Sequence, residues 1–171
     1  MNIRTSLTAL TTALAMAAAA HLGTARLSAA SATASMPVSA TVSDNCTITT
    51  NQVAFGSYDP IVANASANLD AAGAVIIACT KGAVTTLGLD TGTNPSGGTR
   101  QLVSSGSFLT YELYQDSSRS TVWGDSGAAL FNSGTAPSKA ARTFPVYGRI
   151  VGNQDVPAGS YTDSIVATVN F

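Results

Sequence analysis

The C-terminal stretch of the chain, residues 156–171, carries a clear alternation of apolar positions. After the turn-forming sequence Pro-Ala-Gly, every second residue is apolar and falls on one face of an extended chain: Ile165, Ala167, Val169 and Phe171. The alternation predicts a β-strand whose inward face packs on a core. Because a strand hydrogen-bonds along its edges, this one requires a partner.

A second segment with the same period, residues 36–43, precedes the first cysteine. Its alternate apolar positions are Met36, Val38, Ala40 and Val42. Pro37 lies near the start, where a missing N–H group is least costly to a ladder. The segment predicts either the first strand of the chain's own sheet or a strand that pairs elsewhere.

Short apolar segments separated by Gly, Ser, Thr, Asn and Asp account for the rest, and turn signals recur about every 8–12 residues. Further strands are expected at 46–50, 53–56, 74–79, 84–89, 108–114, 122–125 and 144–150. The continuous apolar run 74–79 predicts burial on both faces, and residues 63–72 and 133–142 are expected to be loops. The pattern predicts one all-β sandwich domain of about seven strands.

The N-terminal region has the features of a secretory signal. Arg4 precedes an apolar run over residues 7–20, which is too short for a permanent membrane anchor. Small-residue cleavage sites end at Ala20, Ala30 and Ala34, and the sequence does not choose among them. Residues 1–34 are therefore predicted to be signal peptide and leader, and the remainder to be exported to the periplasm.

The charge of the exported part excludes one class of partner. Residues 1–34 hold two of the eight basic residues and the single histidine, so six basic and nine acidic residues remain, a formal charge of −3. The basic residues do not cluster, and a nucleic-acid partner is not expected.

The two cysteines, Cys46 and Cys79, predict one disulfide, because an even number of cysteines in an oxidising compartment favours pairing. In the chain-entropy model, closing this loop stabilises the fold by roughly 3–4 kcal/mol. No histidine or third cysteine remains to complete a metal site, and no glycine-rich phosphate loop leads into a helix. Neither a metal nor a cofactor is predicted.

The residues offer no catalytic constellation. A nucleophilic triad lacks its base, Glu112 is the only glutamate, and the aspartates lie in or beside turns, where they commonly cap their own backbone. The chain is not expected to be an enzyme. Trp123, with Tyr58 and Tyr114, is the one candidate platform for a sugar ring, although a lone Trp beside a turn is more often a core residue.

Eight segments, taken in order, resemble one known family. They are Cys46-Thr-Ile, Phe55-Gly-Ser-Tyr-Asp-Pro60, Cys79-Thr-Lys-Gly82, Tyr111-Glu-Leu-Tyr-Gln-Asp116, Trp123-Gly-Asp125, Val146-Tyr-Gly-Arg-Ile150, Val156-Pro-Ala-Gly-Ser-Tyr-Thr-Asp163 and Ile165-Val-Ala-Thr-Val-Asn-Phe171. The sequence looks like a spore coat protein U domain, the domain of archaic chaperone–usher pilins, over residues 36–171.

The resemblance implies an incomplete immunoglobulin-like sandwich whose last strand is supplied in trans. It implies a donor extension at residues 35–45 and a pilin domain at 46–171. The expected partners are a periplasmic chaperone on the C-terminal strand, an outer-membrane usher, and neighbouring subunits that donate their extensions. The expected role is a structural subunit of a cell-surface fibre that serves adhesion or biofilm formation. A spore- or cyst-coat protein of the same fold and a carbohydrate-binding tip module are the alternatives.

Overall fold

The structure is a computed structural model and describes residues 28–171. The chain divides into two units, Met1–Ser39 and Ala40–Phe171, and the fold reported below is that of the second unit. Residues 28–45 contain neither helix nor strand, and most of the predicted signal peptide lies outside the described residues. Within the described part of the chain, no helix is long and apolar enough to cross a membrane.

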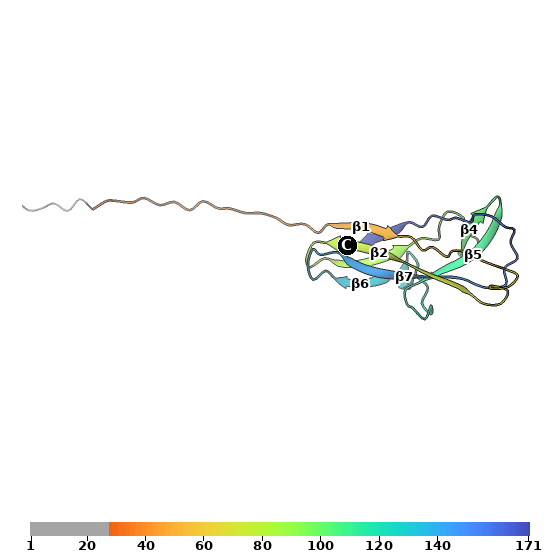
Figure 1. The fold of residues 1–171 in the computed structure, drawn as a ribbon. Coiled ribbons are helices and arrows are strands. Elements are labelled where there is room, and N and C mark those ends of the chain that lie inside the picture. Colours follow the sequence, from red (N-terminus) through yellow and green to blue (C-terminus); the bar gives the residue numbers. More distant parts are fainter. Residues whose placement is uncertain (1–27) are drawn as a thin grey trace, which may run out of the picture. The chain divides into compact units, whose positions relative to one another are not determined.

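The second unit is built from two antiparallel sheets (Figure 1). The larger sheet has the strand order β1 (Cys46–Asn51), β2 (Leu69–Cys79), β7 (Arg142–Ile150), β5 (Ser107–Tyr114) and β4 (Arg100–Ser104). The smaller has the order β6 (Phe131–Thr135), β3 (Val84–Leu89) and β8 (Ala167–Asn170). The predicted all-β sandwich is confirmed, with eight strands in the described chain where the turn spacing indicates about seven.

The core fills the space between the two sheets. Its most deeply buried side chains come from inward-facing positions of both sheets and one loop: Val75, Ile77, Leu87, Ile150 and Trp123. The indole ring of Trp123 stacks on Phe131 at 4.8 Å between ring centroids, and its Nε1 donates a hydrogen bond to the Leu87 carbonyl over 3.0 Å. Trp123 is therefore a satisfied core residue, and the proposal that its ring serves as an exposed sugar platform is wrong.

The predicted disulfide is confirmed. Cys46 and Cys79 lie directly opposite each other in the β1–β2 ladder and are bonded. The bond joins the first residue of one strand to the last residue of the next and therefore ties the edge strand β1 to the interior of the sheet.

Several expected boundaries differ from the structure. Residues 53–56 lie outside any strand, and 122–125 make only one isolated bridge, between Val122 and Tyr114. β2 begins at Leu69, inside an expected loop, because pairing with β7 extends it through Asp-Ala-Ala-Gly, which has no alternation. β6 begins at Phe131 and runs into the expected loop 133–142, and a register shift occurs in its pairing with β3.

Two apolar segments are less enclosed than expected. The run 74–79 is buried on its inward face, but Ile76 and Ala78 on the outer face are only half-buried, because the outer face of the sheet borders solvent. The C-terminal ladder covers only Ala167–Asn170, so Ile165 precedes the strand.

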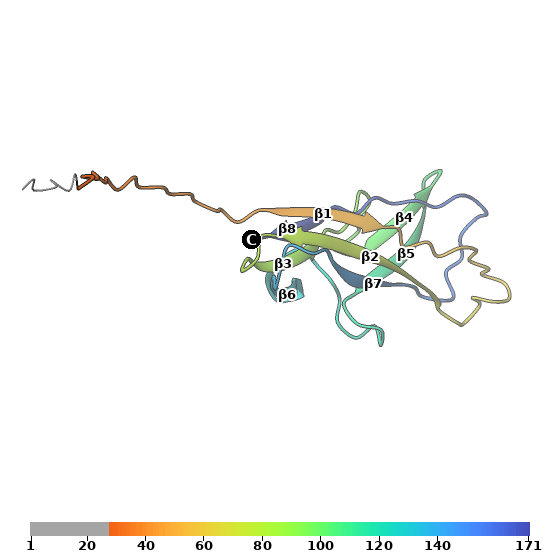
Figure 2. The same ribbon diagram turned by 60° about the vertical axis from the view of Figure 1, so that its left-hand side comes forward.

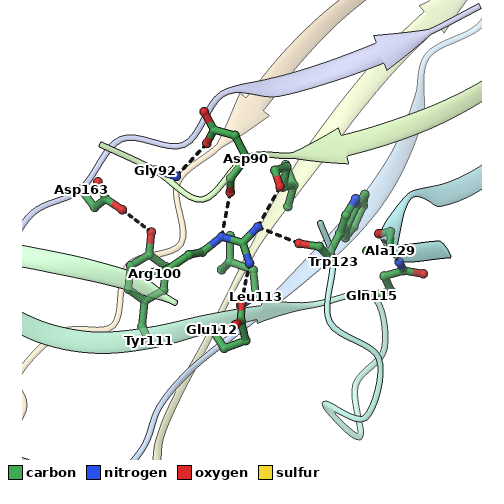
Figure 3. Close-up of polar contacts among 11 residues, drawn as sticks. Asp90, Gly92, Arg100, Tyr111, Glu112, Leu113, Gln115, Trp123, Ala129 and Asp163 are labelled. Carbon is green, nitrogen blue, oxygen red and sulfur yellow. Dashed lines mark hydrogen bonds and ion pairs between the residues drawn. The ribbon is translucent and has the colours of Figure 1, made fainter. Parts of the chain in front are cut away.

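A buried arginine connects the two sheets (Figure 3). The guanidinium of Arg100, on β4, donates hydrogen bonds to the carbonyls of Asp90 at 2.9 Å, Leu89 at 2.8 Å and Trp123 at 2.7 Å. Its Nη1 forms an ion pair with Glu112. Because these partners include the last residue of β3 and the loop that carries Trp123, one side chain holds three parts of the core together.

We expect Arg100→Leu to lower the free energy of unfolding by about 3–5 kcal/mol, because it leaves the Glu112 carboxylate and three carbonyls without their partner. Urea unfolding of the oxidised chain measures the change. Arg149→Leu is the matched control, since Arg149 pairs with Asp70 at the surface and such pairs contribute about 0–1 kcal/mol. Equal losses in the two variants would contradict the assigned role of Arg100.

Candidate functional site

An open groove of about 840 Å³ lies between the edges of the two sheets. Within residues 28–171, β1 and β8 are both edge strands, because β1 pairs only with β2 and β8 pairs only with β3. The two strands run side by side near the C-terminus (Figure 1, Figure 2) without forming a ladder with each other. Beyond them, the chain that follows β1 and the chain that precedes β8 form the two walls of the groove.

The floor of the groove is apolar and comes from the inner faces of both sheets. It is made by Val75, Leu89, Leu109, Tyr111, Leu113, Val146 and Ile150. These side chains also belong to the main core. The groove is thus a cleft in the core that is left open along one side.

The first wall, residues 50–58, is seated by two glycines inside neighbouring strands. A Cβ added to Gly73 of β2 would lie 2.7 Å from Val53, and one added to Gly148 of β7 would lie 2.7 Å from both Val53 and the Phe55 ring. Such distances are too short for real Cβ contacts. The glycines therefore leave the notch in the sheet into which the wall packs.

The second wall, residues 156–167, is held by hydrogen bonds to neighbouring loops and strands. Thr162 and Val103 exchange two backbone hydrogen bonds of 2.9 and 3.1 Å. This bridge also covers the edge of β4. The Val166 N–H donates to the Asp90 carboxylate over 2.9 Å, and the Val166 carbonyl accepts from Asp90 N–H over 3.1 Å. These bonds fix the wall to β4 and to the residue that follows β3.

A polar pair joins this wall to the floor of the groove (Figure 3). The Tyr111 hydroxyl donates to Asp163 Oδ2 over 2.7 Å, and the backbone and hydroxyl of Thr93 donate to Asp163 Oδ1 over 2.9 and 2.7 Å. Burial and the hydrogen bond to this carboxylate raise the pKa of Tyr111. Burial acts to raise the pKa of Asp163, but the hydrogen bonds from Thr93 and Tyr111 outweigh it and hold the pKa below its ordinary value. Both groups keep their usual neutral-pH charge states, which suits a structural role.

Of the C-terminal residues that the alternation singled out, the structure places three against the core: Ile165, Ala167 and Val169. Ile165 and Ala167 also line the groove. Phe171 follows β8 and its side chain is 57% exposed. The inward face predicted for this strand is thus present up to Val169, and the ring of Phe171 is largely open to solvent.

The N-terminal residues singled out by their alternation lie in no strand of the described chain. Met36, Val38 and Val42 are 82–90% exposed, and Ala40 is also exposed. Such exposure is unusual for three large apolar side chains so close together in sequence.

Some site residues had no clear signal in the sequence. Gly73 and Gly148 appear as interruptions of strand patterns, and Asp163 as a turn residue, although Asp163 also binds Thr93 across the groove wall. Arg100 follows a loop and carries no sign that it is buried. Among the described residues there is no group of three or more His, Cys, Asp or Glu side chains arranged to hold a metal ion.

The geometry of the groove suits an extended segment with alternating apolar side chains. Unpaired strand edges can add hydrogen bonds to a new strand, while the apolar floor receives every second side chain. Residues 50–58 span about 30 Å when extended, and a donor of seven residues spans about 23 Å, at roughly 3.3 Å per residue.

Comparison with known proteins identifies the family. Residues 32–168 match the Spore Coat Protein U domain. The chain belongs to the Spore Coat Protein U domain family. A relative in this family, Protein U of Myxococcus xanthus, is 32% identical over 187 aligned residues, which cover 99% of this chain and 98% of the relative. Proteins of the Spore Coat Protein U domain family are structural pilin or coat proteins and are not known as enzymes.

A solved structure shares the fold of this Spore Coat Protein U domain. It is the crystal structure of the CsuC–CsuE chaperone–tip adhesion subunit pre-assembly complex from the archaic chaperone–usher Csu pili of Acinetobacter baumannii. The similarity has a TM-score of 0.53 at 22% identity and covers 77% of this chain and 40% of the solved chain. The likeness shows a common immunoglobulin-like fold.

We expect Gly148→Ala to displace the first wall, because the added methyl group overlaps Val53 and Phe55. Overpacking of this kind lowers the free energy of unfolding by about 1–3 kcal/mol, and amide hydrogens of residues 53–58 are expected to exchange faster. Thermal unfolding and hydrogen exchange measure the two effects. Ala72→Ser, on the exposed outer face of β2, is the control and should stay within about 0.5 kcal/mol. A Gly148→Ala chain that matches the control would contradict the wall packing.

Proposed function

We propose that this chain is a structural subunit of a chaperone–usher surface fibre that assembles by donor-strand complementation. Residues 36–42 of one subunit are the donor strand, and the groove of the next subunit is the acceptor. The observation that carries the proposal is the apolar groove whose walls continue from the edge strands β1 and β8, in a chain whose N-terminal segment exposes alternating apolar side chains.

Burial of apolar side chains and new ladder hydrogen bonds drive complementation, and the ordering of the donor opposes it. Burial of Met36, Val38 or Val42 contributes about 1.5–3 kcal/mol each, and each ladder hydrogen bond adds about 1 kcal/mol. Burial of the smaller Ala40 side chain contributes less free energy, and this residue suits a shallow part of the groove. Ordering the donor costs about 1–2 kcal/mol per residue in backbone entropy. Because the walls of the groove are already fixed, the acceptor loses little further conformational entropy when the donor binds.

Head-to-tail donation produces filaments. The donating segment and the accepting groove are different surfaces of the chain, so the contact is heterologous and does not close on itself. The product is a homopolymer, or a mixed fibre with related subunits. The disulfide Cys46–Cys79 suits an exported subunit.

We further propose that a periplasmic chaperone fills the groove before assembly and that an outer-membrane usher exchanges it for the next donor. The C-terminal strand with Ile165, Ala167 and Val169 is then the chaperone's contact. The fibre stands on the cell surface and serves adhesion or biofilm formation. The chaperone complex of the solved structure that shares the fold supports this order of events.

The second candidate is a spore- or cyst-coat component assembled by the same strand exchange. The similarity to Protein U of Myxococcus xanthus over almost the full length of both chains favours it. Electron microscopy with an antibody to the chain separates the two, because label on thin surface fibres supports the pilus and label on the coat of resting cells supports the coat.

We expect Val38→Asp to abolish fibres, because the charge enters an apolar groove without a partner. Ser39→Asp is the matched control: its side chain points to the opposite face of the donor strand, and fibres should persist. Electron microscopy of cells that express each variant at equal level is the measurement. Fibres in the Val38→Asp strain, or loss of fibres in both strains, would contradict the assigned donor.

A further inference from the structure

The three residues between the donor segment and β1 form a sequence that normally turns. Ser43, Asp44 and Asn45 are turn-forming residues flanked on both sides by alternating segments. Two alternating segments joined by a three-residue polar loop make the pattern of a β-hairpin. Such a hairpin would lay residues 36–42 along the free edge of β1 in the same chain. A subunit closed in this way would occupy the free edge of β1 with its own segment and accept no donor there.

The structure has no turn at these residues. Thr80, which directly follows Cys79, holds them instead. Its backbone N–H donates to the Asn45 carbonyl over 2.9 Å, and its hydroxyl accepts from Asn45 N–H over 3.1 Å. The same hydroxyl donates to the Ser43 carbonyl over 3.3 Å.

These hydrogen bonds compete directly with a hairpin. A three-residue loop at 43–45 is classically a type I turn followed by a left-handed residue, and it is closed by a hydrogen bond from Asn45 N–H to the Val42 carbonyl. In the structure this N–H donates to the Thr80 hydroxyl instead. The disulfide keeps Thr80 in place. Because Cys79 is bonded to Cys46, the next residue, Thr80, is held beside Asn45.

The hydrogen bonds of Thr80 to Ser43 and Asn45 are called the Thr80 clasp below. We propose that this clasp keeps the subunit from complementing itself, so that the donor segment remains available to a second copy of the chain. This inference rests on the proposed function, since it concerns the choice between donation within one chain and donation to another. Thr80 is a positioning residue, because it acts on the linker 43–45 and does not line the groove.

The test compares Thr80→Val with Thr80→Ser in the full chain, secreted to the periplasm of a bacterial host. Valine keeps the shape and the backbone N–H but removes the hydroxyl, whereas serine keeps the hydroxyl. Thr80→Ala is a second variant without the hydroxyl. Size-exclusion chromatography with light scattering gives the monomer fraction, and hydrogen exchange of residues 36–42 in the monomer shows whether the segment is paired. A chain lacking residues 36–42 identifies the oligomers that require donation.

We expect Thr80→Val and Thr80→Ala to raise the ratio of monomer to oligomer about fivefold, as for the loss of one net hydrogen bond, with residues 36–42 protected in the monomer. Thr80→Ser should stay within about twofold of the wild type. The clasp is overturned, and the proposed function left intact, if the wild type forms oligomers that require residues 36–42 and the ratio of monomer to oligomer is the same in Thr80→Val and Thr80→Ala. A wild type whose oligomers do not require residues 36–42 would overturn both.

Discussion

The structure depends on the missing hydrogen-bonded ladder between β1 and β8. Each of these strands is paired on one side only, and the chain around them opens into a groove with a floor of core side chains. Unpaired backbone groups beside an apolar cleft cost free energy and promote association with other chains. A strand from another chain would pair the free backbone groups and cover the apolar cleft at the same time. This explains why the domain keeps a cleft in its core.

Other features of the domain keep this groove rigid. The disulfide fixes β1 to β2, the notch at Gly73 and Gly148 seats the first wall, and the bonds of Thr162 and Val166 fix the second. Arg100 joins the sheets behind the groove. Because these elements are ordered without the donor, the entropy cost of complementation falls mainly on the donated segment. A rigid acceptor groove and an exposed donor segment both favour strand donation between subunits.

The sequence predicts the fold class well, because alternation at Leu109, Tyr111 and Leu113 and the paired cysteines are local signals. It also singles out residues 36–42, since their alternation has the strand period. It fails at residues 53–56, which have a strand pattern but no ladder, because the pattern cannot tell whether a partner exists in the same chain. The burial of Arg100 depends on carbonyls from three separate segments that only the folded chain brings together, so it leaves no local signal.

The most direct measurement is hydrogen exchange of the assembled protein compared with the single subunit. The account predicts that amides of three regions become protected together on assembly: residues 36–42, the first wall at 53–58, and β8. Joint protection shows that the donor enters the groove between both edges. Protection of residues 36–42 with no change at 53–58 and β8, or assembled protein with residues 36–42 still exchanging freely, would contradict donor-strand complementation.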